Sequence, residues 1–188
     1  MLKCTFDAYH YPYYNIDMNE NSQIHEALQS FRLPAYHEIP DVGLYLDQVA
    51  KYMNSFLDEF PEMNVTPSMI SNYAKQKLID RVNKKRYTRD QIAMLLMIAL
   101  TKTVISIDHV RVLIDDVNRT GTTTEEVYDR FRAVLHDVLS SFNGPQLSVE
   151  LKTGTELEQM ARNVIITIAH KMYLERYFEN KAESDPEE

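Results

Sequence analysis

The spacing of apolar side chains predicts a chain built mostly of α-helices. From Asp41 onward, apolar residues return every three or four positions, which aligns them along one face of a helix. The first stripe runs from Val42 to Phe56, with Asp41 placed to cap its first turn and Pro61 beyond its end. A shorter helix is expected before it, at Ser22–Phe31. The fold class that follows from this pattern is all-α.

Capping signals divide the rest of the chain into further helices. A serine or threonine before a helix accepts a hydrogen bond from an unpaired backbone N–H, and a glutamate or glutamine three residues on returns the bond. The nearly all-apolar helix Ile92–Leu100 should lie at the centre of the fold. The predicted caps, in chain order, are Thr66, Thr88 with Gln91, Ser106, Thr122 with Glu125, and Thr155 with Glu158.

The same signals divide the chain into four parts. Residues 1–32 hold an aromatic arm and a short helix, and residues 33–120 hold a helical domain. Residues 121–179 form a region of two long helices suited to dimerisation or effector binding. The acidic tail, 180–188, is expected to be disordered. A short strand stays open only at Leu147–Leu151 and in the basic loop described below.

The N-terminal arm gathers aromatic side chains around one proline and has no helical period. Two interpretations stay open: the rings dock on the body or on a partner subunit, or they form a patch that binds a ligand. The segment after the short helix, punctuated by Pro34 and Pro40, should be extended. The aromatic residues of the arm are Phe6, Tyr9, Tyr11, Tyr13 and Tyr14.

Composition narrows the class of protein. With 188 residues, 44% of them hydrophobic and 26% charged, the chain suits one folded domain or two small ones. Four glycines and seven prolines disfavour a β-barrel, and there is no glycine-rich phosphate loop. Cys4 is the single cysteine, which excludes an internal disulfide and favours the reducing cytoplasm. No signal pattern opens the chain and no apolar run is long enough to cross a membrane, so we expect a cytoplasmic protein without membrane contacts.

Positive charge gathers in one short piece of this acidic chain. Thr66–Asp90 holds seven basic residues and two acids, a net charge of +5. The whole chain carries −8, so everything outside this window sums to −13. A basic run is most often a solvated surface, but the acidic remainder does not exclude DNA as a partner, because only the docking face must be positive.

The basic window begins with a predicted helix over residues 67–78 that has two unlike faces. One face is apolar, with Ile70, Tyr73 and Leu78, and would be buried. The other offers hydroxyls, amides and one cation without an acid, which suits a helix in the DNA major groove, where amides reach base edges and lysine reaches phosphate. The residues of this face predicted to contact DNA are Ser68, Ser71, Asn72, Lys75 and Gln76.

A short cationic loop over residues 80–87 follows this helix. Its cations would neutralise backbone phosphates, which supply the main and salt-dependent part of DNA affinity. The order of helix, turn, groove-facing helix, basic loop and helix describes a winged helix-turn-helix. The predicted phosphate contacts in and beside this wing come from Lys84, Lys85, Arg86 and Arg89.

Three motifs between Thr66 and Ile114 carry a family resemblance: TPSMISNYAKQKLI, KRYTRDQI and VISIDHVRVLI. In this order they resemble the second helix of MerR-type regulators, the step from the MerR wing into the next helix, and the segment after it. The resemblance implies a MerR-like winged helix-turn-helix over residues 33–120. With LPAYHEIPDVGLYLDQVAKYMNSFL ahead of them, they are closer to an uncharacterised bacterial family, domain of unknown function 1836, over roughly Leu33–Leu139. That family brings no established activity.

The predicted groove helix departs from the MerR pattern at three positions. Ser71 stands where MerR proteins usually have arginine, Asn72 where they have tyrosine, and Lys77 where they end the helix with glycine. The wing is shorter, the linker before the helix is longer, and no MerR effector region is recognisable in the C-terminal third. We therefore expect phosphate contacts more than base-specific contacts.

Residues suited to catalysis or metal binding do not converge in the sequence. No two histidines lie at metal-ligand spacing on one helix, and neighbouring acids such as Asp115 and Asp116 diverge. Met94 and Met97 are interpreted as core rather than as an adaptable binding surface. We expect no enzymatic activity, no cofactor and no metal. The scattered histidines are His10, His25, His37, His109, His136 and His170.

These observations predict a transcription regulator that binds double-stranded DNA. The stripes of residues 122–178 can pack on each other within one chain or across a two-fold axis, and a homodimer gains site length and affinity. A small-molecule effector under the C-terminal helices stays open, with no residue pattern that identifies it. The alternative is a helical protein–protein interaction module that has lost DNA binding.

Overall fold

The computed structural model describes residues 18–142 and 154–184, and these residues are mostly helical, as predicted. The aromatic residues of the arm, Cys4, His10, Leu147–Leu151 and the last four residues lie outside the described residues. In chain order the elements are α1 (Met18–Ser30), the 3-10 helix η1 (Tyr36–Glu38), β1 (Leu44–Tyr45), α2 (Leu46–Leu57), the 3-10 helix η2 (Pro61–Met63), α3 (Pro67–Lys75), β2 (Arg86–Tyr87), α4 (Arg89–Thr101), α5 (Ile107–Thr120), α6 (Thr124–Ser141) and α7 (Glu156–Ser184).

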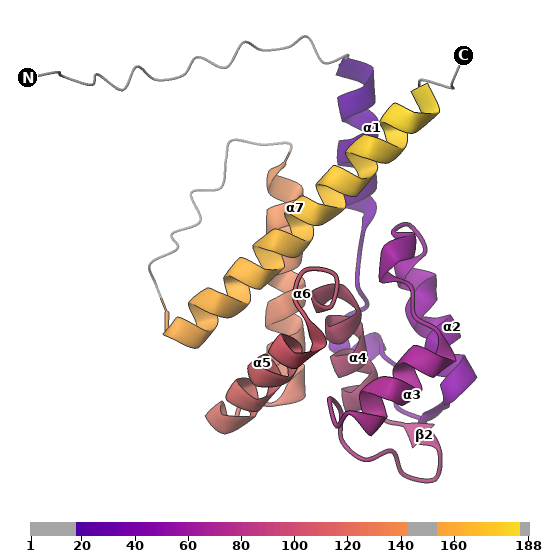
Figure 1. Ribbon diagram of the computed structural model, residues 1–188, viewed down its shortest axis with the longest axis vertical. Helices are drawn as coiled ribbons and strands as arrows, with labels where there is room; N and C mark the ends of the chain where they lie inside the picture. Colours follow the sequence, from indigo (N-terminus) through magenta and orange to yellow (C-terminus); the bar gives the residue numbers. More distant parts are fainter. Residues whose placement is uncertain (1–17, 143–153, 185–188) are drawn as a thin grey trace, which may run out of the picture.

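Helices α1, α4, α6 and α7 form the body of the molecule. The long helix α7 crosses α6 and α1 and also contacts α4 (Figure 1). Most of α4 is buried, including Met97, so its predicted central position is confirmed. α7 continues to Ser184, so residues 180–184, expected to belong to a disordered tail, are helical.

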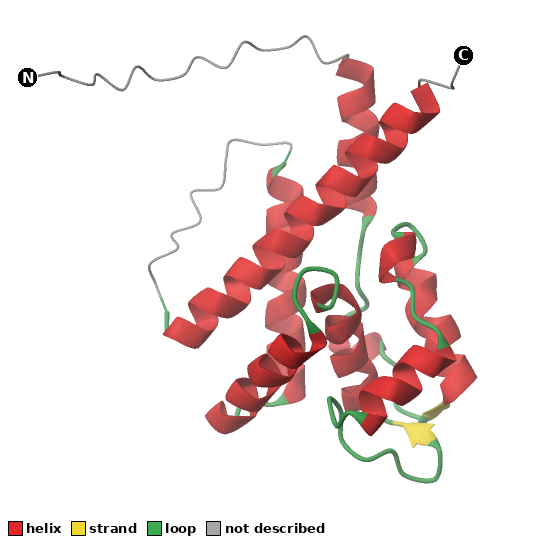
Figure 2. Cartoon of the chain, in the orientation of Figure 1, coloured by secondary structure: helices red, strands yellow, loops and turns green. Residues whose placement is uncertain are grey.

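Helices α2 and α3 pack on each other beside this body. The strands β1 and β2 pair antiparallel, with Leu44 opposite Tyr87 and Tyr45 opposite Arg86 (Figure 2). The buried side chains of this part and of the body belong to one cluster, which includes Met53 of α2 and Met172 of α7. A continuous core therefore joins the α2–α3 unit to the C-terminal helices.

The start of α2 differs from the sequence prediction. The helix begins at Leu46, and Asp41 does not cap it. Gly43 has a left-handed backbone (φ +66°), and the next two residues are held extended by their pairing with β2. The helix therefore starts only after Tyr45, whose backbone N–H donates to the Gln48 side chain at 2.9 Å. Strand pairing with a partner far along the chain decided this boundary.

Four of the six predicted caps are confirmed by side-chain hydrogen bonds, and Asp41 is one of the two that are not. The cap of α6 is wrong by one residue, because Gly121 ends α5 in a left-handed conformation and Thr122 still belongs to the linker. Thr123 and Glu126 form the capping box instead, with 3.3 Å between Glu126 N and Thr123 Oγ1. The confirmed caps are Thr66, Thr88 with Gln91, Ser106, and Thr155 with Glu158.

Candidate nucleic-acid interface

Helix α3 turns one face to the core and one to solvent, as its sequence predicts. Ile70 and Tyr73 are buried against α2 and the surrounding core. At the start of the helix, Thr66 Oγ1 accepts the Met69 N–H at 3.2 Å, and Pro67 occupies the first helical position, where no backbone donor is needed. The exposed residues on the outer face are Ser68, Asn72 and Lys75.

Two of the predicted DNA contacts on α3 are only half-exposed. Ser71 lies toward the edge of the outer face. Gln76 follows the last helical residue, and its Oε1 accepts a hydrogen bond from Arg111 Nη2 of α5 at 3.3 Å. The same arginine forms an ion pair with Asp108 at 3.0 Å. Gln76 thus helps to attach the end of α3 to α5, and the outer face is narrower than the sequence suggests.

The end of α3 is a tight left-handed turn at Lys77, so the helix stops at Lys75 and does not reach residue 78. Lys77 has φ +59°, and the Leu78 N–H reaches back to the Tyr73 carbonyl at 3.1 Å. This is the bond of a Schellman motif, in which glycine is the usual left-handed residue. Lys77 therefore has the left-handed backbone that glycine usually adopts at the end of a helix.

The basic loop ends in a two-residue β-hairpin turn. Lys84 and Lys85 both have left-handed backbones, with φ +47° and +61°, and the Arg86 N–H donates to the Asn83 carbonyl at 2.9 Å. Two consecutive left-handed residues define a type I′ turn, which asparagine and glycine favour and lysine does not. Both lysine side chains are exposed at the tip of this turn.

The loop is fixed at both ends. At its start the Asp80 carbonyl accepts a hydrogen bond from Gln91 Nε2 of α4 at 2.9 Å. At its end, β2 pairs with β1. The hairpin tip and α3 lie at the same end of the molecule along its long axis (Figure 1). The lysine side chains at the tip therefore project from an anchored loop.

Arg86 lies against the β1 segment. Its Nη1 donates to the carbonyls of Val42 and Gly43 at 3.3 and 3.2 Å, and its Nη2 donates to the Tyr45 hydroxyl at 3.1 Å. Its guanidinium also lies over the Tyr45 ring, 4.7 Å from the centroid. A Cβ at Gly43 would come within 3.3 Å of the Arg86 Cβ, so glycine at this position permits the close approach. These contacts give Arg86 a structural role that sequence reasoning missed.

Arg89 is likewise occupied by contacts within the fold. Its Nε donates to the Ile39 carbonyl at 2.8 Å, and its Nη2 lies 4.0 Å from the Asp41 carboxylate. Its guanidinium is 5.5 Å from the centroid of the Tyr36 ring, and only 25% of its side chain is exposed. Asp41, expected as a helix cap, thus pairs with α4 instead.

Two further cations of the basic window, Lys77 and Arg81, are exposed and were not among the predicted contacts. Lys77 follows α3 and Arg81 lies in the loop, so both belong to the stretch that joins the helix to the hairpin. Charge density along the window was the signal that could have included them. We call the exposed set Ser68, Asn72, Lys75, Lys77, Arg81, Lys84 and Lys85 the candidate interface.

The described residues give no support to two other kinds of site. Within 18–142 and 154–184, no group of three or more histidine, cysteine, aspartate or glutamate side chains is placed to hold a metal ion. In those same ranges, no helix is both long and apolar enough to cross a membrane. His109 is exposed, as expected.

The fold and the candidate interface define a class of mostly helical protein that presents a short capped helix and a lysine-tipped hairpin at one end. The chain belongs to the family described as Domain of unknown function (DUF1836), whose model matches residues 34–131. This range contains every residue of the candidate interface, and the match confirms the resemblance to domain of unknown function 1836. No curated protein and no solved structure matches the chain.

Proposed function

We propose that this protein is a DNA-binding transcription regulator with a MerR-like winged helix-turn-helix. In this proposal α2 and α3 form the helix-turn-helix, α3 faces the major groove, and the hairpin tipped by Lys84 and Lys85 is the wing. The observation that carries the proposal is the type I′ turn with lysine at both left-handed positions. Backbone strain of this kind persists mainly where function requires the residue, and here each strained residue presents a cation.

The outer face of α3 supports the same function. Lys75 and the lysines of the hairpin suit phosphate oxygens, whereas Ser68 and Asn72 offer a hydroxyl and an amide to base edges. Because Arg86 and Arg89 bind carbonyls of the protein itself, phosphate contacts are expected from the exposed lysines and from Arg81. Binding should be dominated by charge and only weakly selective for sequence.

The experiment is a titration of double-stranded DNA with the protein at several salt concentrations. Fluorescence anisotropy measures the binding. Wild type should bind at low salt, and its log affinity should decrease linearly with log salt concentration. Each phosphate contact removed should make this decrease shallower by about 1 in slope. Lys85→Glu should weaken binding strongly. The matched control is Arg119→Glu, which makes the same charge change on α5, outside the proposed helix-turn-helix and wing, at a side chain that is 76% exposed.

Two results would contradict the proposal. One is wild-type protein that gives no anisotropy change at low salt. The other is an equal loss of affinity in Lys85→Glu and Arg119→Glu, since net charge alone would then account for the binding. Arg86 is left unchanged in these variants because its loss would disturb the hairpin. Selection of bound sites from random DNA then measures how much sequence is read.

The second candidate function is a protein–protein interaction module. Val42 and Tyr45 lie beside the hairpin and are 76% and 48% exposed, which is unusual for large apolar side chains. If DNA does not bind, this apolar patch becomes the first surface to test. Val42→Asp should then abolish association with a partner and leave the fold intact.

We also propose that the protein is a homodimer through α7. Leu174 and Phe178 are 51% and 64% exposed and lie four residues apart, so they share one face of this helix. A second copy would cover them and bring two α3 helices to one DNA. Analytical ultracentrifugation should give a dimer for wild type and a monomer for Leu174→Glu with Phe178→Glu. A monomeric wild type at all concentrations would refute the dimer.

A further inference from the structure

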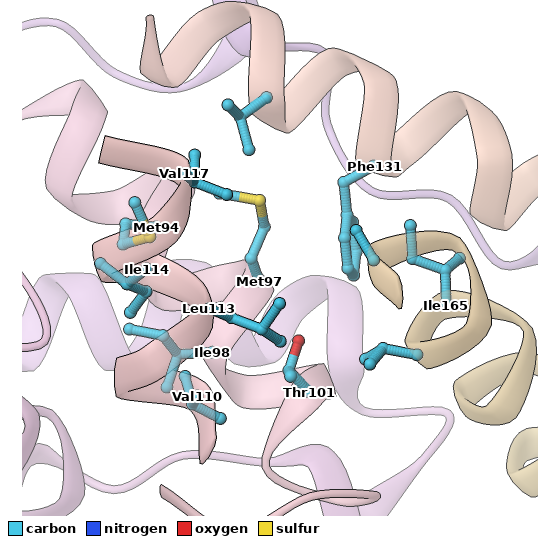
Figure 3. A pocket seen from close by; sticks show the side chains of 13 residues that line it. Met94, Met97, Ile98, Thr101, Val110, Leu113, Ile114, Val117, Phe131 and Ile165 are labelled. Atoms are coloured by element: carbon cyan, nitrogen blue, oxygen red, sulfur yellow. The ribbon is translucent and has the colours of Figure 1, made fainter. Parts of the chain in front are cut away.

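An apolar hollow lies between four helices, away from the candidate interface. Its walls come from α4, α5, α6 and α7, and the space has a volume of about 570 Å³, including the part open to solvent. Figure 3 shows Met97 of α4, Leu113 of α5 and Phe131 of α6 around this space. The enclosed part of this space is about 100 Å³. This is below the roughly 300–1,000 Å³ of drug-sized sites and close to the roughly 150 Å³ apolar cavity that binds benzene.

The wall chemistry selects the class of ligand. Among the described residues that line the hollow, Thr101 is the single one with a polar side chain, and none carries a charge. Figure 3 shows the Thr101 oxygen turned toward the same space as Leu113 and Met97. A charged ligand would lose its hydration here without a compensating partner. The hollow therefore suits an uncharged, largely apolar molecule with at most one hydrogen-bonding group.

Helix α5 provides an independent reason to expect an occupant. Its apolar residues recur on one face, yet Val110 is its single buried residue, while Leu113, Ile114 and Val117 are half-exposed around the hollow. An amphipathic helix normally buries such a stripe. Here the stripe faces an unfilled space, so a molecule in the hollow would complete the packing of α5.

The size of the hollow distinguishes a small molecule from a partner helix. An α-helix with its side chains is about 10–12 Å wide and rises about 5.4 Å per turn, so the enclosed space of about 100 Å³ is smaller than a single turn. Four separate helices also make the walls concave rather than one flat apolar face. A compact organic molecule fits these dimensions better than a segment of protein.

We infer that the hollow between α4, α5, α6 and α7 is a binding site for an uncharged apolar small molecule, with the Thr101 hydroxyl as its one polar contact. This inference does not depend on DNA binding, because the hollow shares no residue with the candidate interface. It gives chemical content to the effector site that the sequence left open.

The test uses the full chain and N-phenyl-1-naphthylamine, an uncharged aromatic probe whose fluorescence rises when it leaves water. Wild-type protein should bind the probe saturably, with one site per chain. Ala161→Phe places a ring in the hollow from α7 and should weaken binding by at least about tenfold, since a few methylene equivalents in an apolar pocket have effects of this size. The control Ala182→Phe makes the same substitution at an exposed position of the same helix and should bind as wild type does.

A second pair of variants guards against loss of folding in the first. Leu113→Lys puts a cation into the wall from α5 and should also weaken probe binding by at least about tenfold. Val112→Lys, at the neighbouring exposed residue, should leave probe binding unchanged. Circular dichroism checks that each variant keeps its helices.

Three results would overturn the inference. The first is wild-type protein that shows no saturable fluorescence change. The second is probe affinity in folded Ala161→Phe and Leu113→Lys equal to that of their controls. The third is a dimer that does not bind the probe and that Ala161→Phe dissociates into monomers. This result would mean that a second copy of the chain fills the hollow.

Discussion

At the scale of single residues, five of the seven cations of the basic window fall into two groups. Arg86 and Arg89 use their planar, multidonor heads to bind backbone carbonyls and stack on tyrosine rings. Lys77, Lys84 and Lys85 instead hold left-handed backbones and expose their side chains. Arg86 and Arg89 therefore hold the hairpin and α4 to residues 36–45, whereas the three lysines supply exposed positive charge at an energetic cost to the backbone.

The first prediction concerns Lys77. Lys77→Gly should raise the free energy of unfolding by about 1 kcal/mol, because a left-handed backbone strains a residue with a Cβ and does not strain glycine. Urea denaturation followed by circular dichroism measures the change. Lys77→Ala removes the same charge but keeps the Cβ, so it should not stabilise the protein. Equal stabilisation by both variants would assign the effect to charge and contradict the prediction.

The second prediction concerns the buried Tyr128 of α6. Its hydroxyl donates to the Pro34 carbonyl at 2.9 Å, which attaches the segment after α1 to α6. Tyr128→Phe should lower the free energy of unfolding at neutral pH by about 1 to 2 kcal/mol, because the carbonyl then stays buried without its partner. Urea titrations of both proteins at neutral pH measure this difference.

The pH dependence of that difference is a sharper test. Burial raises the pKa of Tyr128 well above its ordinary value. Above pH 10 or so, where tyrosine ionises in the unfolded chain, the folded state keeps a proton that the unfolded state loses. Wild-type stability should then fall by up to about 1.4 kcal/mol per pH unit from this residue, and the gap to Tyr128→Phe should narrow. If the difference in unfolding free energy between wild type and Tyr128→Phe stays constant from about pH 9 to about pH 11, Tyr128 does not carry the raised pKa.

At the scale of elements, the sequence predicts helices well and tertiary boundaries poorly. Apolar stripes and local caps are properties of neighbouring residues, so α4, α5 and α7 could be placed from the sequence alone. The strand β1 could not, because only its partner β2, some forty residues later, holds it extended. The roles of Gln76 and Arg86 also depend on contacts with distant segments. Of the candidate interface, the sequence could therefore predict the charge but not which cations are held by contacts within the fold.

The third prediction tests the corrected cap of α6. Thr123→Ala should lower the free energy of unfolding by about 1 kcal/mol, because it removes the side-chain acceptor at the helix N-terminus. Thr122→Ala is the control, since Thr122 lies in the linker and its hydroxyl contacts only that of Thr120. Thermal and urea unfolding of the two variants measure the difference. A larger loss in Thr122→Ala would restore the cap that the sequence predicted.

At the scale of the whole molecule, α7 connects the hollow to the α2–α3 unit. Ala161 and Ile165 line the hollow, whereas Arg176 reaches the linker between α2 and α3. The Glu62 carboxyl of that linker is also partly buried near α7, and this burial raises its pKa. One rigid helix therefore touches both the proposed ligand site and the segment that orients α3.

Arg176 is the main polar contact between α7 and this linker. It donates from Nη2 to the Glu59 carbonyl and from Nη1 to Glu179 at 3.1 Å, and its guanidinium lies 4.8 Å from the centroid of the Phe60 ring. Only 23% of its side chain is exposed, so solvent screens these contacts less than it screens a surface ion pair. The contact should thus contribute more to stability than an exposed arginine does.

The last prediction compares two arginines of different exposure. Arg176→Ala should lower the free energy of unfolding by about 1 to 3 kcal/mol, through the lost hydrogen bond and the lost cation–π contact. Arg176→Lys should recover only part of this, because an ammonium lacks the planar fork. Arg130 of α6 is 67% exposed and forms an ion pair with Glu158. Arg130→Ala removes this ion pair and should lower the free energy of unfolding by less than about 1 kcal/mol.

Urea unfolding followed by both circular dichroism and tyrosine fluorescence checks the stabilities and the unity of the fold. Because one buried cluster joins the α2–α3 unit to α7, the two signals should change in a single transition in wild type and in both alanine variants. If Arg176→Ala costs no more than Arg130→Ala, the linker contact does not stabilise the molecule. If the two signals separate in wild type, the α2–α3 unit folds independently, and α7 cannot transmit a change from the hollow to α3.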